Sequence, residues 1–227
     1  MMKIDFATIF PEFITPYLNG AMMQRAQDAG AVNFGVHDIR DFSTDKHKRV
    51  DDTPYGGGAG MVMQVEPIYK TVEHIISEDN KKKRRTILLS AKGNQYTQRD
   101  AERLKEYEQI VLICGRYEGV DDRVAEHIAD EEMAIGEYVL TGGELGAMVI
   151  ADSVVRLLPK VLGNVESAIH ESYSVDGYKE YPQYTKPEEF NGWRVPEVLL
   201  SGHHKNIARW REQQSKNIDN VSKEEKK

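Results

Sequence analysis

The sequence has 227 residues, of which 40% are hydrophobic, and its formal net charge is −7. This length allows one substantial core with a small second unit. The negative charge argues against a protein that coats nucleic acid through bulk positive charge, but it leaves room for an enzyme with a local basic face. The single cysteine, Cys114, argues against a disulfide framework or a cysteine metal cluster. No segment approaches the roughly 18 apolar residues of a membrane span, so we expect a cytoplasmic protein.

Up to about residue 160, short apolar runs rich in β-branched residues alternate with helical patterns. This alternation predicts an α/β fold with parallel strands joined by crossover helices. The predicted strands are 3–9, 32–38, 86–89, 109–114 and 132–135.

Helices are predicted between these strands. Pro67 occupies a first helical position, and apolar residues at helical spacing follow it. Thr97 and Asp100 have the spacing of a capping box. A third helix is predicted from 144 to 158, because Pro159 would stop it.

Beyond residue 163 the sequence becomes polar and aromatic, which predicts a change of domain. Short helices are predicted at 196–200 and 207–214, and the polar residues from 215 onward are expected to be disordered. The predicted organisation is an α/β domain over 1–162, a linker over 163–175 and a small helical domain over 176–227.

Glycine is concentrated in three loops, at 55–61, 114–119 and 135–143. None has the spacing of a P-loop or of a dinucleotide-binding motif. A single such loop is best explained as a turn. Two of them directly follow predicted strands, however, where ligands bind in open α/β sheets. Gly142 and Gly143 also precede a helix whose free N–H groups favour negative charge. The residues therefore predict a nucleotide-like ligand that is held largely by the main chain.

Four motifs occur in a fixed order: VDDTPYGGG at 50–58, CGRYEG at 114–119, IGEYVLTGGEL at 135–145 and YTKP at 184–187. On these motifs the chain resembles the bacterial tRNA (guanine-N1)-methyltransferases of the SPOUT class. The resemblance implies a parallel sheet with a deep trefoil knot, and a homodimer whose subunits share active sites. It also implies tRNA as substrate, methylated on N1 of guanine at position 37, 3′ of the anticodon. S-adenosylmethionine would be the donor, with Mg²⁺ as a further requirement whose site is not visible in the sequence.

The resemblance also assigns binding residues, most of which would act through their backbone at the donor. The donor residues are Leu88, Leu89, Ser90, Gly115, Ile135, Tyr138, Leu140, Gly142 and Gly143. The tRNA residues are Arg25, Asp52, Ser172, Gln183 and Lys186, with His203, Lys205 and Arg209 in support.

Guanine N1 carries a proton at neutral pH, so methylation requires a base to remove it and a cation to hold the charge that develops on O6. By resemblance the cation is Arg156, although an ion pair with Asp152 one helical turn earlier is an alternative role. The base would be Glu171, where the family has aspartate. An added methylene displaces the carboxylate, and a misplacement of about 1 Å can cost on the order of a hundredfold in rate. Asp176 is the alternative base.

Two further departures concern tRNA binding. Gln183 and Lys186 stand where the family often has histidine and arginine, and lysine cannot reproduce the planar fork of arginine. Two alternatives to this function stay open, and the second depends on Glu171 rather than on these two residues. One is a SPOUT RNA methyltransferase that acts on a ribose hydroxyl or a different base, and the other is a non-catalytic RNA-binding relative that has lost its base.

Overall fold

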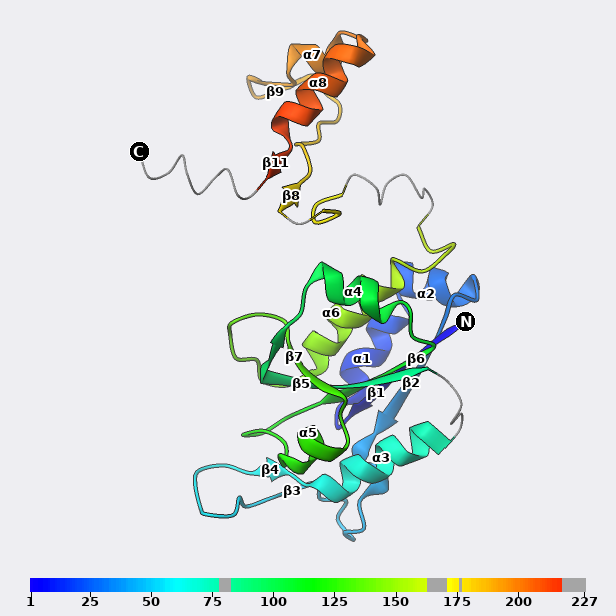
Figure 1. Cartoon of the computed structure of the whole chain (residues 1–227), viewed down its shortest axis with the longest axis vertical. Coiled ribbons are helices and arrows are strands. Elements are labelled where there is room, and N and C mark those ends of the chain that lie inside the picture. Colours follow the sequence, from blue (N-terminus) through cyan, green and yellow to red (C-terminus); the bar gives the residue numbers. More distant parts are fainter. Residues whose placement is uncertain (78–82, 163–170, 176, 218–227) are drawn as a thin grey trace. The chain divides into compact units, whose positions relative to one another are not determined.

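A computed structural model describes residues 1–77, 83–162, 171–175 and 177–217 of the chain (Figure 1). The chain divides into two compact units, Met1–Gly163 and Asn164–Lys227, and each is described by itself. The predicted domain limits stay a prediction. Within the described residues, no helix is long and apolar enough to cross a membrane.

The first unit is built on a five-stranded parallel sheet in the order β2–β1–β6–β5–β7 (Figure 1). This confirms the predicted α/β class with parallel strands. Every residue of β6 is buried, as its continuous apolar run indicates for a strand covered on both faces. The strands are β1 Met2–Thr8, β2 Val32–Asp38, β5 Arg84–Gln95, β6 Gln109–Cys114 and β7 Glu131–Ala134.

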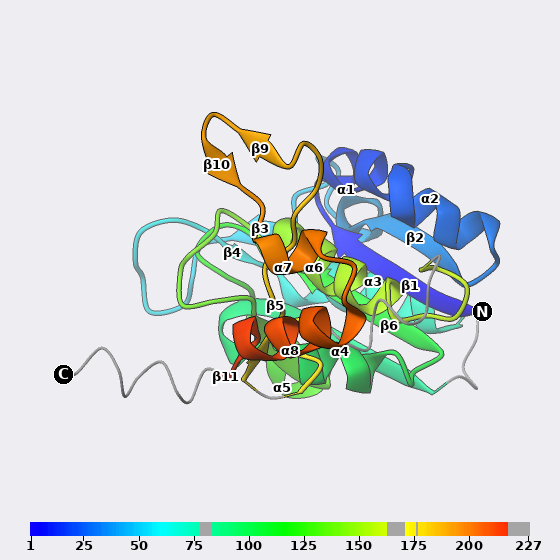
Figure 2. The ribbon, with the colours of Figure 1, turned by 90° about the horizontal axis from the view of Figure 1, so that it is seen from above.

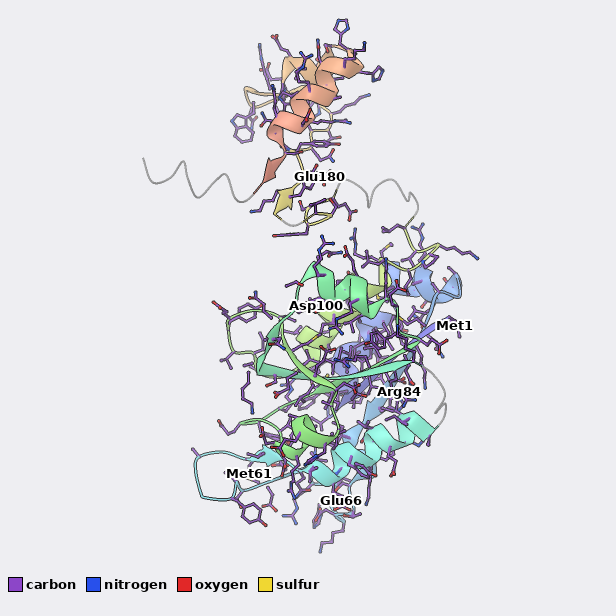
Figure 3. All side chains as sticks on the ribbon, in the orientation of Figure 1. Met1, Met61, Glu66, Arg84, Asp100 and Glu180 are labelled. Carbon is purple, nitrogen blue, oxygen red and sulfur yellow. The ribbon has the colours of Figure 1, made fainter. Side chains whose placement is uncertain are left out.

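Helices cover both faces of this sheet, and side chains fill the two layers between (Figures 1 and 3). On one face lie α1 Pro11–Leu18, α2 Ala21–Asp28, α4 Gln98–Leu104 and α6 Glu144–Val155. On the other face lie the 3₁₀ helix η1 Ile39–Phe42 and the helices α3 Val65–Ser77 and α5 Arg123–His127. Because successive strand side chains point to opposite faces, Leu89 packs in the core under α1, α2, α4 and α6, whereas Leu88 packs in the core under η1, α3 and α5.

Several elements differ from their predicted extent. The predicted strand 86–89 is only part of β5, which continues past a bulge between Leu89 and Asn94 before pairing again with β7. The continuation is polar, so its sequence carries no apolar alternation that could predict it. The third predicted helix ends at Val155 rather than at residue 158. The N–H groups of Leu157 and Leu158 bond to carbonyls three residues back, which tightens the last turn before Pro159.

The other local predictions vary in outcome. The capping box is confirmed, because the N–H of Thr97 donates to the Asp100 carboxylate at 2.9 Å. Helices α1, α2 and α5 were not predicted. Helix α1 contains Pro16 in its interior, and α5 has only five residues, so neither has a clear helical pattern. A short hairpin of β3 Asp51–Asp52 and β4 Val62–Met63 was also missed.

The second unit contains short elements only (Figure 2). Two-stranded pairs form between β8 Tyr178–Lys179 and β11 Lys216–Asn217, and between β9 Glu189–Phe190 and β10 Trp193–Arg194. Helix α7 Glu197–Leu200 follows β10, and α8 His204–Gln214 begins three residues earlier than predicted.

The expected disorder from residue 215 is wrong for 215–217. There β11 pairs with β8, and the hydroxyls of Ser215 and Tyr178 lie 3.1 Å apart. This pairing joins segments far apart in the sequence, so local composition could not reveal it. The remaining residues of the predicted tail, 218–227, lie outside the described residues.

Candidate functional site

A cavity of roughly 300 Å³ lies beside the bulge of β5 and the loops that follow β6 and β7. These three strands are neighbours in the sheet, which brings segments far apart in sequence to one place. The nine residues predicted to bind the donor all line this cavity. The sequence-based assignment therefore describes one continuous surface, while the ligand that it binds stays a prediction.

Glycine at 142 and 143 allows the loop 135–143 to lie directly against neighbouring segments. A Cβ on Gly143 would lie 2.8 Å from the Cα of Cys114 and 2.9 Å from the Cβ of Leu89. A Cβ on Gly142 would overlap the guanidinium of Arg116. The N–H of Gly143 donates to the carbonyl of Gly115 at 2.9 Å. This N–H, expected to be free for a ligand, instead joins the two loops.

A buried ion pair lies next to these glycines. Glu144, in the first turn of α6, is 2% exposed and accepts hydrogen bonds from Arg116 Nε at 2.9 Å and Thr8 Oγ1 at 2.8 Å. Arg116 also donates to the carbonyl of Thr141 at 3.2 Å, and its guanidinium stacks 4.6 Å from the ring centre of Phe10. The sequence did not reveal that Glu144 and Arg116 form a pair, because only the tertiary structure brings the two together.

Cys114 lies under the same loop but is not equipped as a nucleophile. Its side chain is fully buried, and burial raises the pKa of its thiol well above the ordinary value. The nearby charge of Glu144 raises this pKa further. Cys114 therefore stays protonated and contributes to packing rather than to chemistry.

Backbone hydrogen bonds connect the end of the glycine loop 55–61 and β4 to the loop that follows β6. The N–H of Glu118 donates to the carbonyl of Met61, which Figure 3 labels, at 3.0 Å. The N–H of Met63 donates to the carbonyl of Gly119 at 2.9 Å. A Cβ on Gly60 would overlap the Glu118 side chain, so glycine permits this close approach. Two of the three glycine loops thus form one joined surface, with Tyr55 fully exposed on it.

The other predicted residues of the first unit lie away from the cavity lining. Arg156 directly follows α6, and its N–H donates to the carbonyl of Asp152 at 3.1 Å. The carboxylate of Asp152 accepts a hydrogen bond from Tyr17 on α1. Arg25 is exposed in the last turn of α2, and Asp52 is exposed in β3.

The remaining predicted residues belong to the second unit. The hydroxyl of Ser172 accepts a hydrogen bond from the N–H of Glu180 at 3.0 Å, and Gln183 donates to the Glu180 carboxylate. Figure 3 labels Glu180. Glu171 is half-buried and Lys186 is exposed, whereas Asp176, the alternative base, lies outside the described residues. Across the described ranges, no group of three or more histidine, cysteine, aspartate or glutamate side chains is placed to hold a metal ion.

Comparisons with known proteins place these features in a family. The family model described as tRNA (Guanine-1)-methyltransferase TrmD matches residues 2–225. The tRNA (guanine-N(1)-)-methyltransferase of Halalkalibacterium halodurans is 54% identical over 214 residues, which cover 94% of this chain and 86% of the relative. That of Geobacillus kaustophilus is 51% identical with the same coverage. The crystal structure of tRNA (m1G37) methyltransferase from Aquifex aeolicus matches with a TM-score of 0.80 and 36% identity, over 100% of this chain and 94% of that one.

Proposed function

The chain belongs to the tRNA (guanine-1)-methyltransferase TrmD family, and on this premise we propose that it methylates N1 of guanine 37 in tRNA with S-adenosylmethionine as donor. It is a tRNA (guanine-N1)-methyltransferase, as its relatives are. The observation that carries the detailed proposal is the single cavity that all nine expected donor residues line.

The donor pocket combines apolar walls with exposed main-chain groups. Leu88, Ile135 and Leu140 offer apolar surface for a purine, and the glycines at 115 and 142 leave backbone groups accessible. S-adenosylmethionine, when bound, supplies an electrophilic methyl group. The role of the protein is to orient it toward the guanine and to exclude water, which is catalysis by positioning.

We assign the proton transfer to Glu171, whose carboxylate takes the N1 proton as N1 attacks the methyl carbon. Arg156 stabilises the negative charge that develops on O6 as this proton leaves. Arg25, Asp52, Ser172, Gln183 and Lys186 are proposed to position the tRNA, with the guanine extruded from its stack. No step is assigned to Mg²⁺, for which the described residues form no cluster of three or more histidine, cysteine, aspartate or glutamate side chains.

The proposal includes a homodimer and a trefoil knot. An exposed patch on α1 and α6 supports the homodimer, since Phe13 and Leu145 are 52% and 57% exposed there, beside Tyr17 and Val149. Such a patch is typical of an interaction surface, and two copies of one chain commonly associate through the same patch. The match to the Aquifex aeolicus enzyme over the whole chain supports the knot. The tRNA substrate that we propose for this chain supports a cytoplasmic location.

The deciding experiment is methylation of a defined transcript. The protein is incubated with S-adenosylmethionine and a tRNA transcript that carries guanine 37, and the product is digested to nucleosides. We expect 1-methylguanosine, which disappears when guanine 37 is replaced by adenine. Methylation of a ribose or of another base would favour a different RNA methyltransferase. Binding of tRNA without donor consumption would favour a non-catalytic relative.

A further inference from the structure

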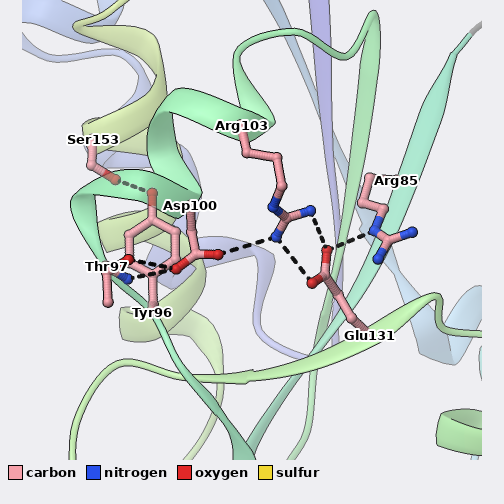
Figure 4. A network of polar contacts seen from close by, with 7 residues as sticks. All are labelled: Arg85, Tyr96, Thr97, Asp100, Arg103, Glu131 and Ser153. Carbon is pink, nitrogen blue, oxygen red and sulfur yellow. Dashed lines mark hydrogen bonds and ion pairs between the residues drawn. The ribbon is translucent and has the colours of Figure 1, made fainter.

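Two adjacent glutamates on β7 have opposite surroundings. Successive side chains of a strand point to opposite faces, so Glu131 and Glu132 lie on different sides of the sheet. The Glu131 carboxylate accepts hydrogen bonds from Arg85 at 2.6 Å and from Arg103 at 3.0 and 3.1 Å (Figure 4). Through Arg103 this network reaches Asp100 in the capping box of α4. Both carboxylate oxygens of Glu131 are thus occupied by hydrogen bonds from arginines of the protein itself.

Glu132 faces the donor cavity instead. It pairs in register with Leu88 and lines the cavity with Lys92 and Asp122. Its Oε2 atom is buried and has no hydrogen-bond partner in the described part of the chain. Lys92 donates a hydrogen bond to Asp122 at 2.8 Å, which is the main reason that the pKa of its ammonium is raised, and the nearby charge of Glu132 raises it further.

A buried carboxylate oxygen without a donor is unfavourable, since it has lost its hydration and gained nothing in exchange. Such an atom in a folded protein calls for an explanation. The residue that carries it lines the donor cavity, so a small rotation of the side chain would bring the carboxylate to a bound ligand. S-adenosylmethionine carries positive charge and two kinds of N–H group, on the adenine amine and on the ammonium of its amino-acid end. Either would complete the hydrogen bonding of Glu132.

We propose that Glu132 is a donor-binding residue, and that its carboxylate accepts a hydrogen bond from an N–H group of S-adenosylmethionine. The inference rests on the proposed donor site and adds to it a side chain that recognises the donor by charge. Glu132 was not among the residues that the family motifs suggested.

The first test compares ligand affinity with stability. S-adenosylhomocysteine, which retains both N–H groups, is titrated calorimetrically into the wild type, Glu132→Gln and Glu132→Ala. We expect Kd to rise by about tenfold to a hundredfold, the usual effect of losing a hydrogen bond to a charged group. The Tm of both ligand-free variants should equal or exceed that of the wild type, because the substitutions remove a charged carboxylate whose Oε2 is buried without a hydrogen-bond partner among the described residues.

Glu131→Gln is the matched control. It changes the neighbouring residue on the same strand in the same way, but it weakens the contacts with Arg85 and Arg103 (Figure 4). We expect its Tm to fall while its Kd for S-adenosylhomocysteine stays within about twofold of the wild type. A rise of Kd in Glu132→Gln alone, together with a fall of Tm in Glu131→Gln alone, would separate ligand binding from structural support.

Two analogues identify the recognised group. 5′-Methylthioadenosine lacks the amino-acid end, and S-inosylhomocysteine lacks the adenine amine. If Glu132→Gln weakens 5′-methylthioadenosine as much as S-adenosylhomocysteine but does not weaken S-inosylhomocysteine, the contact is with the adenine amine. If it weakens S-adenosylhomocysteine alone, the contact is with the ammonium. In the first case Glu132→Gln should also improve the binding of S-inosylhomocysteine, because the new amide can donate to the oxygen that replaces the amine.

Unchanged affinity of Glu132→Gln and Glu132→Ala for S-adenosylhomocysteine, with a wild type that binds it, would overturn this inference and leave the proposed function intact. A wild type that does not bind S-adenosylhomocysteine would overturn the donor site itself. The two failures are therefore distinguishable in one set of titrations.

Discussion

Arg116 and Glu144 form an ion pair with Nε and Oε2 2.9 Å apart, where the loop after β6 meets the first turn of α6. Their side chains are 16% and 2% exposed, so the pair is largely removed from water. Arg116 also donates a hydrogen bond to the carbonyl of Thr141, and its guanidinium lies over the ring of Phe10. It therefore connects the loop 135–143 to Phe10, the residue that directly precedes α1.

Removing one partner of this pair should be strongly destabilising. Glu144→Ala leaves Arg116 buried without its carboxylate, and we expect it to lower the free energy of unfolding by about 3–5 kcal/mol in urea titrations. The matched control is Asp41→Ala, because the Lys48–Asp41 pair is about 60% exposed on both sides, so water screens it and its loss should change the stability little. Equal losses for the two variants would contradict the importance of the buried pair.

Glycine at position 143 should be essential, whereas glycine at 146 should not. Gly143→Ala places a methyl group against the backbone of Cys114, which cannot move without displacing β6. We expect binding of S-adenosylhomocysteine, followed by calorimetry, to fall more than tenfold. Gly146→Ala meets the flexible end of the Leu89 side chain at 3.0 Å and the Cγ2 of Ile135 at 3.6 Å, with no backbone atom in the way, and it improves helix propensity. Gly146 also lines the cavity, but only side chains need to shift there, so its loss of binding should be much smaller than that of Gly143→Ala. A comparable loss in both variants would refute the argument.

The stability of the protein should decrease in acid through Asp5. Burial alone would raise the pKa of Asp5, but hydrogen bonds from His37 and Gln109, together with the charge of Lys3, hold it below its ordinary value. A carboxyl with a depressed pKa in the folded state stabilises the protein above its unfolded-state pKa, and this contribution disappears as the pH falls through the folded-state value.

We therefore expect the free energy of unfolding to decline below about pH 4, and Asp5→Asn to be less stable at neutral pH but to show a flatter decline. Urea titrations between pH 3 and 7 would measure both effects. An equally steep decline in Asp5→Asn would assign the acid sensitivity to other groups.

The patch on α1 and α6 should mediate dimer formation. Leu145→Lys puts a charge on this patch, and we expect sedimentation to change from a dimer to a monomer. Methyl transfer should be lost as well, because the proposed dimer would share its active sites between subunits. Tyr69→Lys is the control, since Tyr69 is 49% exposed on α3, which covers the opposite face of the sheet. A monomeric wild type would overturn the proposed dimer.

Glu171 should act on the chemical step rather than on donor binding. Glu171→Ala should lower kcat by about a hundredfold or more, the usual contribution of a general base, with little change in the KM for S-adenosylmethionine. Glu171→Asp, which restores the residue usual in the family, should retain most activity. Near-normal turnover by Glu171→Ala, together with inactivity of Asp176→Ala, would transfer the role to Asp176.

The sequence by itself determined the strands at 32–38 and 109–114 to the residue. The second of them is a nearly continuous run of β-branched and other apolar residues. The sequence also determined the capping box of α4, which depends on two residues three positions apart. The motifs placed the chain in its family and brought together a set of donor residues that line one cavity. All these features are local or are shared with relatives.

Only the tertiary structure decided how Glu131, Glu132 and Glu144 differ. In the sequence they are ordinary polar residues, two of them adjacent on a short strand and one at a helix start. Folding places Glu131 between two arginines, leaves Glu132 Oε2 without a partner among the described residues, and buries Glu144 against Arg116. The role of a carboxylate depends on the charges and hydrogen-bond donors that surround it, and here these come from other segments of the chain.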